Sequence, residues 1–163
     1  MSFFTRWLRS LKFRWIRAWH YLHGYVKIRY EFLPDEKGNP SPSELVWARP
    51  LGNNLFQVEN VPEDIVDVNL HDVVKCKLVD DQLPVIVEIV RVSGNRTLRV
   101  EFRHGAPMQD VADVIRTLQS QNVFYEQSGR WRYMFNIEPT MNYDSIRDSL
   151  KSREVQGLLK VVE

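Results

Sequence analysis

The fold is decided by residues 97–162, TLRVEFRHGAPMQDVADVIRTLQSQNVFYEQSGRWRYMFNIEPTMNYDSIRDSLKSREVQGLLKVV. Polar and apolar residues alternate at 97–103, which predicts a half-buried strand with Leu98, Val100 and Phe102 on its core face. A helical repeat, a strand pair, a second helix and a short apolar segment follow. This order predicts a ferredoxin-like βαββαβ unit.

Each later element of this stretch has its own local signal. Proline suits a first helical turn, Gln-Ser-Gly-Arg between two apolar runs predicts a hairpin, and Thr or Asn side chains cap helices. The predicted elements are a helix from Pro107, strands at 123–126 and 131–137, a helix capped by Thr140 or Asn142, and a strand at 158–162.

The formal charge of +1 averages three unlike regions. Residues 1–30 carry seven Lys/Arg and no acid, residues 31–96 carry six Lys/Arg against twelve Asp/Glu, and residues 97–163 carry nine of each. We therefore divide the chain into three parts: a basic amphipathic N-terminal helix at 1–24, an acidic, small β-barrel-like module at 25–96, and the ferredoxin-like domain at 97–163.

The middle module contains several short segments with strand patterns, which is typical of a small antiparallel barrel or a strongly bent sheet. Residues 61–68 are acidic and are expected to be irregular or a single helical turn. The predicted strands lie at 25–32, 44–49, 55–58, 72–79 and 84–92, with turns at 52–54 and 80–82. The predicted fold class is thus α+β.

The N-terminal arm places Trp7, Leu11, Trp15 and Trp19 on one helical stripe, with arginines largely opposite. These residues are the expected contacts of the arm, and several targets remain open. In the main alternatives, the helix packs on its own domains or on a twin subunit, it docks on a protein partner, or it lies on an anionic membrane surface. An organelle presequence and a nucleic-acid-binding arm are further alternatives.

The sequence offers little support for catalysis. The single cysteine, Cys76, suits a cytoplasmic location and is expected to be a small core residue. His20 and His23 lie one turn apart without further ligands beside them, and His71 lacks the context of a catalytic dyad. No phosphate-binding glycine pattern occurs. We therefore expect a non-enzyme without a cofactor or a metal.

A nucleic-acid-binding surface is a competing interpretation. Trp131, Tyr133, Phe135 and Ile137 alternate along one predicted strand, as the stacking aromatics of RNA-recognition domains do. The region is neutral, however, and its neighbour is acidic, whereas binding of a nucleic-acid backbone requires a basic surface. The alternation is also typical of a strand that faces a helix, so nucleic acid is disfavoured as a partner.

Several turn and packing motifs resemble an uncharacterised bacterial family that is described only as a domain of unknown function. The motifs are Trp47 with Pro50-Leu-Gly52, Val58-Glu-Asn-Val-Pro62, Leu70-His-Asp-Val-Val74, Val92-Ser-Gly-Asn-Arg-Thr-Leu-Arg-Val100, Asn142-Tyr-Asp-Ser-Ile-Arg147 and Glu154-Val-Gln-Gly157. Some members of this family lie beside secreted toxins, so the resemblance implies an immunity-type role. It carries no catalytic residues to transfer.

We therefore expect a non-catalytic protein-binding module, specifically a cytoplasmic immunity protein that covers the active site of a bacterial toxin. The acidic module is the expected contact, because an acidic surface complements a basic groove. A nucleic-acid-binding protein, a membrane-surface adaptor and a homo-oligomer remain alternatives. The expected partner-binding residues are Glu59, Glu63, Asp64, Asp67, Asp72, Asp80 and Asp81.

Overall fold

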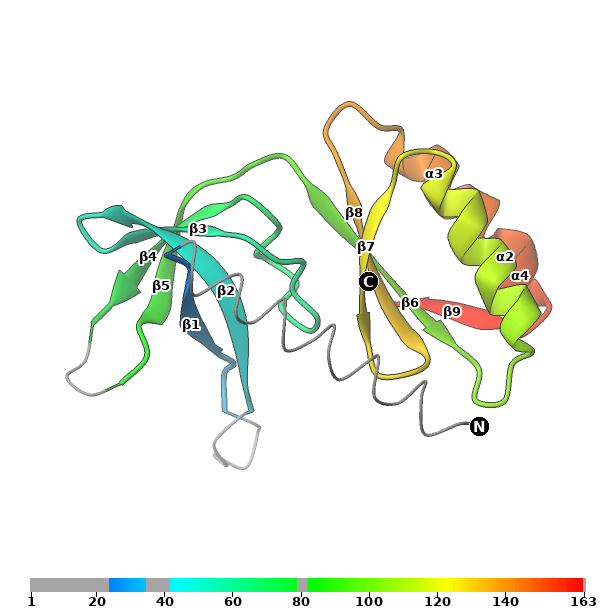
Figure 1. Cartoon of the computed structure of the whole chain (residues 1–163), viewed down its shortest axis with the longest axis horizontal. Coiled ribbons are helices and arrows are strands. Elements are labelled where there is room, and N and C mark those ends of the chain that lie inside the picture. Colours follow the sequence, from blue (N-terminus) through cyan, green and yellow to red (C-terminus); the bar gives the residue numbers. More distant parts are fainter. Residues whose placement is uncertain (1–23, 35–41, 79–81, 163) are drawn as a thin grey trace.

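The computed structural model describes residues 24–34, 42–78 and 82–162. It is α+β, as predicted: five strands come first, and a four-stranded antiparallel sheet with helices follows. Figure 1 shows the five-stranded unit on one side of the four-stranded sheet and the helices on the other.

The first five strands close into a barrel in which each strand neighbours the next in the chain. Consecutive strands are antiparallel, and a parallel contact between Arg29 and Val85 joins the first strand to the last. Apolar side chains that alternate along these strands fill the barrel. The strands are β1 (Val26–Glu31), β2 (Ser43–Gly52), β3 (Leu55–Val58), β4 (Val73–Lys77) and β5 (Val85–Arg91).

The second unit is an antiparallel sheet with the strand order β7-β8-β6-β9. The core between this sheet and the helices includes the predicted strand residues Leu98, Val100 and Phe102. Asn142 caps the second helix, accepting a hydrogen bond from the Ser145 amide at 3.0 Å. The elements are β6 (Arg96–Phe102), α2 (Met108–Gln119), β7 (Phe124–Ser128), β8 (Arg132–Ile137), α3 (Tyr143–Ser149), α4 (Lys151–Val155) and β9 (Leu159–Val162).

The expectation that β6 is only half-buried is wrong. The segment between β3 and β4, residues 59–72, extends from the barrel over the sheet face opposite the helices, and we call it the bridging loop. Its residues Val61 and Leu70 form a small apolar cluster with Met134 of β8. Arg99, which the polar-apolar alternation assigned to the outer face of β6, is consequently only 5% exposed.

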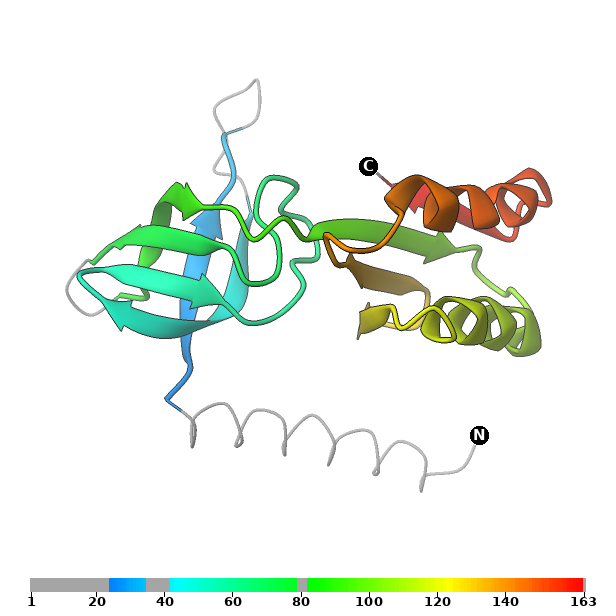
Figure 2. The ribbon, with the colours of Figure 1, turned by 90° about the horizontal axis from the view of Figure 1, so that it is seen from above.

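Figure 2 shows the chain passing from the barrel to the sheet, and residues 92–95 form this crossing. The crossing is hydrogen-bonded to the bridging loop. The Ser93 hydroxyl and the Asn95 side-chain amide both donate to the Leu70 carbonyl at 2.8 Å. Gly94 has a φ of +85°, and a Cβ at this position would lie 2.9 Å from Pro139. The crossing therefore has a fixed path that requires glycine.

Candidate functional site

A cleft of about 540 Å³ opens between the barrel, the bridging loop and β7, and we call it the acidic cleft. Among the lining residues that the structure describes, four carry carboxylates and none carries a basic group, and apolar side chains supply part of the wall. The lining residues are Phe32, Pro42, Ser43, Glu44, Leu45, Asn60, Val61, Glu63, Asp64, Glu126, Gln127, Ser128 and Met134.

Glu44 at the start of β2 holds the bridging loop by its backbone amides. Its Oε1 accepts from the Glu63 amide at 2.6 Å, and its Oε2 accepts from the Asp64 and Ile65 amides at 2.8 and 3.0 Å. Such charge-assisted bonds are stronger than neutral ones. Three successive amides of an irregular segment are thus satisfied by one side chain.

Arg99 of β6 holds the same segment by its carbonyls. Its Nε donates to the Glu63 carbonyl at 2.8 Å, and its Nη2 donates to the Ile65 carbonyl. Burial lowers the pKa of Arg99, an effect that the negative charge of Glu44 opposes. The barrel and the sheet therefore grip residues 63–65 from opposite sides, which gives the cleft a fixed wall.

Glu126 of β7 stands on the facing wall. Its Oε1 accepts a hydrogen bond from the Val61 amide at 3.0 Å. Burial raises the pKa of Glu126 from 4.5 to about 7, although the bond from Val61 favours the charged form. A cation entering the cleft would stabilise the carboxylate further and release a proton.

Arg132 of β8 lies behind the cleft and pairs with two of its acids. Its Nη1 lies 3.0 Å from Oε1 of Glu63, and its Nη2 lies 2.7 Å from Oδ1 of Asp64. Each carboxylate uses one oxygen in this contact, and the positive charge of Arg132 offsets part of their negative charge. These pairs also connect the bridging loop to the sheet.

The structure separates the residues expected to bind a partner. Glu63 and Asp64 lie together in the acidic cleft. Glu59 pairs instead with Arg49 at 3.2 Å, and Asp67 accepts from the Tyr30 hydroxyl at 3.2 Å. The remaining expected contacts that lie outside the described residues are Asp80, Asp81, Trp7, Leu11, Trp15 and Trp19.

Asp72 requires a correction, because its carboxylate is not on the surface. It is 1% exposed and accepts hydrogen bonds from the Asn69 amide at 2.8 Å and the Ser93 amide at 2.6 Å. Its role is to hold the bridging loop to the crossing between the units. The sequence shows Asp72 before an apolar strand, a position that does not distinguish a surface acid from a buried backbone acceptor.

Two residues of the cleft, Glu44 and Glu126, were not among the contacts expected from the sequence. Glu44 contacts amides 19 to 21 positions away, and Glu126 contacts an amide 65 positions away. The available signal was weak: each is a glutamate within a segment of strand pattern. Local spacing cannot predict these contacts, since they depend on how the two units meet.

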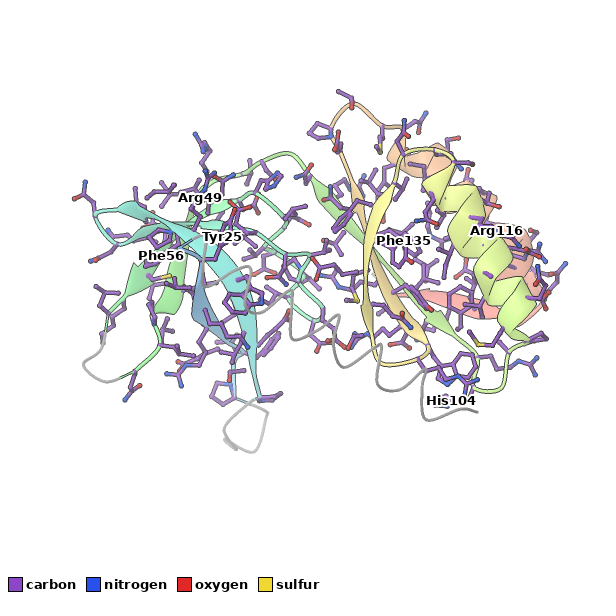
Figure 3. All side chains as sticks on the ribbon, viewed as in Figure 1. Tyr25, Arg49, Phe56, His104, Arg116 and Phe135 are labelled. Atoms are coloured by element: carbon purple, nitrogen blue, oxygen red, sulfur yellow. The ribbon has the colours of Figure 1, made fainter. Side chains whose placement is uncertain are left out.

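The aromatic alternation of β8 belongs to the core. Tyr133 is 4% exposed and Phe135 is 0% exposed, and both pack with Leu118 of α2 in one cluster. Figure 3 shows Phe135 between the sheet and the helices. These rings therefore do not offer open faces on which nucleic-acid bases would stack.

Other reactive groups do not converge on the cleft. Cys76 is buried in the barrel, as expected, and burial raises the pKa of its thiol to about 12. No group of three or more His, Cys, Asp or Glu side chains within residues 24–34, 42–78 and 82–162 is arranged to hold a metal ion. Within the same ranges, no helix has the length and hydropathy needed to cross a membrane.

Comparisons with known proteins support the resemblance inferred from the sequence. A solved structure described as a hypothetical protein from Neisseria gonorrhoeae is similar in fold, with a TM-score of 0.71 and 17% identity. The similarity covers 85% of this chain and 92% of that chain. None of the curated proteins compared with the sequence matches it. A family model described as a domain of unknown function (DUF4265) matches residues 44–161, more than half of the chain, so the chain belongs to the DUF4265 family.

Proposed function

We propose that the chain is a non-catalytic protein-binding module whose acidic cleft receives a basic segment of its partner. The observation that carries this proposal is the cleft itself, which has four carboxylates and no basic side chain among its described lining residues. Its wall at residues 63–65 is held from both sides by Glu44 and Arg99. A charged site with fixed walls favours fast and selective association with a complementary surface.

The specific role that we propose is neutralisation of a bacterial toxin in the cytoplasm. The module would cover the active site or substrate groove of the toxin, and no reaction would be catalysed. A basic groove, such as that of a nuclease or nucleotide-binding enzyme, is complementary to the acidic cleft. The toxin assignment rests on the sequence resemblance to a family in which some members lie beside secreted toxins.

Binding is favoured over catalysis by the chemistry of the lining. Ser43 and Ser128 supply hydroxyls, but the described residues of the lining include no histidine, cysteine or lysine to activate a nucleophile. Glu126 alone combines burial with a raised pKa. One titratable carboxylate without a convergent partner suits recognition of a cation better than general acid–base chemistry.

We also assign the second unit to the ferredoxin-like class. The βαββαβ order and the strand order β7-β8-β6-β9 support this assignment. The fold does not itself specify a function. The membrane-adaptor alternative depends on residues 1–24, nearly all of which lie outside the described residues.

The proposed role is tested with the product of the adjacent gene in the source genome. We expect its expression alone to arrest bacterial growth, and co-expression of the full chain to restore growth. Purified proteins should associate at a rate that falls as salt increases. A chain with Glu63 replaced by Gln and Asp64 by Asn should associate more slowly, and urea denaturation of the free chain shows whether the loss of charge at their contacts with Arg132 affects folding.

Glu88→Gln is the matched control, because Glu88 is an exposed acid of β5 outside the acidic cleft. It should leave the association rate unchanged. A folded full chain that neither binds the adjacent gene product nor restores growth would contradict the toxin role. An association rate that is insensitive to the double substitution of Glu63 and Asp64 at low salt would exclude the cleft as the contact.

A further inference from the structure

One edge of strand β2 lies beside the acidic cleft and, over its first residues, pairs with no other described strand. The strand begins at Ser43, but its pairing with β3 begins only at Ala48. Between Ser43 and Trp47, β2 contacts the bridging loop through the Glu44 side chain and through Trp47, without a strand ladder, and Ser43 and Leu45 form part of the cleft lining. Within residues 24–34, 42–78 and 82–162, the first residues of β2 therefore have a neighbouring strand, β1, on one side only.

The backbone groups of Leu45 point toward this open edge. Trp47 donates its amide to the Asn60 side chain at 2.6 Å and accepts from the Glu59 amide at 2.8 Å, so its groups face away from β1. Backbone direction alternates along a strand, so Leu45, two residues earlier, faces the same way.

The opposite strand confirms this direction independently. Arg29, which is paired with Leu45, donates its amide to the Pro84 carbonyl at 2.8 Å on the far side of β1. Arg29 and Leu45 therefore form a non-hydrogen-bonded pair, in which both residues direct their backbone groups outward. Within the described residues, the Leu45 amide and carbonyl have no hydrogen-bond partner, and Leu45 is 41% exposed.

The open backbone groups of Leu45 favour an extended occupant. A helix bonds its own backbone groups and would leave those of Leu45 unpaired. An extended segment has free amides and carbonyls at the spacing that a strand edge requires.

We propose that β2 accepts an added strand: an extended segment of the protein partner, carrying Lys or Arg side chains, pairs with Ser43–Leu45 in the acidic cleft. This inference rests on the proposed protein-binding function and specifies how the partner is held. Backbone bonds to β2 give the segment its register, and the carboxylates of Asp64 and Glu126 receive its basic side chains. Phe32, which is only partly buried, contacts the apolar parts of the segment.

The probe is an acetylated and amidated hexapeptide of alternating valine and lysine, titrated into the ¹⁵N-labelled full chain. We expect the largest amide shifts at Ser43 and Leu45. N-methylation of the peptide amides that face β2 should weaken binding at least tenfold, because it blocks strand pairing but keeps every charge. Replacing lysine by glutamate should abolish binding.

Leu45→Pro is the matching change in the protein, with Leu45→Ala as its control. Proline is tolerated at a strand edge, and the Leu45 amide is not used in pairing with β1. We expect Leu45→Pro to weaken peptide binding at least tenfold and Leu45→Ala to change it less than threefold. If the proline variant does not fold, the N-methylated peptide still tests the inference.

Equal binding of the methylated and unmethylated peptides would overturn strand addition. So would amide shifts centred on β7 instead of β2, or a Leu45 amide already protected from exchange in the free chain, since the chain's own residues would then occupy the edge. If the adjacent gene product binds Leu45→Pro as tightly as the unaltered chain, strand addition fails while the proposed function stands. If that product does not bind the unaltered chain, the proposed function fails.

Discussion

Glu44→Gln removes one charge without changing the shape of the side chain, and we expect it to loosen the bridging loop. Glutamine keeps a single acceptor atom, whereas Glu44 accepts from three amides at 2.6, 2.8 and 3.0 Å. Its Nε2 would therefore face at least one backbone amide, donor against donor. The bonds that remain would become neutral.

The magnitude follows from these bonds. A hydrogen bond to a charged group contributes about 1.5–3 kcal/mol and a neutral bond about 0.5–1.5 kcal/mol. Losing one charged bond and weakening two others by about 1 kcal/mol each sets an upper limit of about 5 kcal/mol. Because Glu44 is partly exposed, water and counterions reduce the effect, and we expect a loss of about 2–3 kcal/mol.

Urea denaturation at pH 7, followed by tryptophan fluorescence and circular dichroism, measures this loss. In thermal unfolding, a loss of this size should lower the melting temperature of the chain by about 5–10 °C. Glu88→Gln, at an exposed acid of β5, should change the unfolding free energy by less than about 0.5 kcal/mol. A Glu44→Gln chain as stable as that control would show that the three bonds do not hold the loop.

Four further predictions test other contacts. Arg99→Met should lower the free energy of unfolding by about 2–4 kcal/mol. Together with Glu44→Gln, the loss should be smaller than the sum of the two single losses, because both residues hold 63–65, and strict additivity would contradict this. Because the pKa of Glu126 is raised in the folded chain, folding favours its protonated form. This stabilisation is complete below pH 4.5 and is lost as pH rises through about 7. Unfolding free energies from pH 4 to 8 should therefore show Glu126→Gln gaining up to about 3 kcal/mol relative to the unaltered chain at pH 8, and parallel curves would refute this. Cys76→Ser should cost about 1–2 kcal/mol, and the native thiol should react with a disulfide reagent only on unfolding; rapid modification of the folded chain would contradict its burial. Gly94→Ala should cost about 2 kcal/mol or more and exceed Gly129→Ala, whose added Cβ meets no atom within 4 Å, and equal costs in calorimetry would remove the role of Pro139.

The elements were largely predictable because their signals are local. The alternation of Leu98, Val100 and Phe102 identified the core face of β6, and Asn142 was one of two expected caps. The left-handed backbone of Asn53 and Asn54, with φ of 52° and 59°, agrees with the turn expected there. Such features depend on neighbouring residues and need no knowledge of tertiary contacts.

The site was less predictable because it forms where two units meet. A count of acids in residues 31–96 suggested one acidic face, yet Asp72 is buried and Glu59 pairs with Arg49. Glu63 and Asp64 do reach the cleft, but the wall that carries them depends on Glu44 and Arg99. Local charge patterns do not indicate which acids are used internally.

The bridging loop affects how this protein emerges from the ribosome. The barrel strands are synthesised before Arg99 and Glu126. Until these two residues emerge, three backbone groups of the loop lack their hydrogen-bond partners: the Glu63 and Ile65 carbonyls and the Val61 amide. When residues up to 95 have left the exit tunnel and β6 is still inside it, the five strands are present but the bridging loop is held by barrel residues such as Glu44 alone. We expect a ribosome-bound chain arrested at this stage to be cleaved by protease within residues 59–72, and cleavage to stop once β8 has left the exit tunnel.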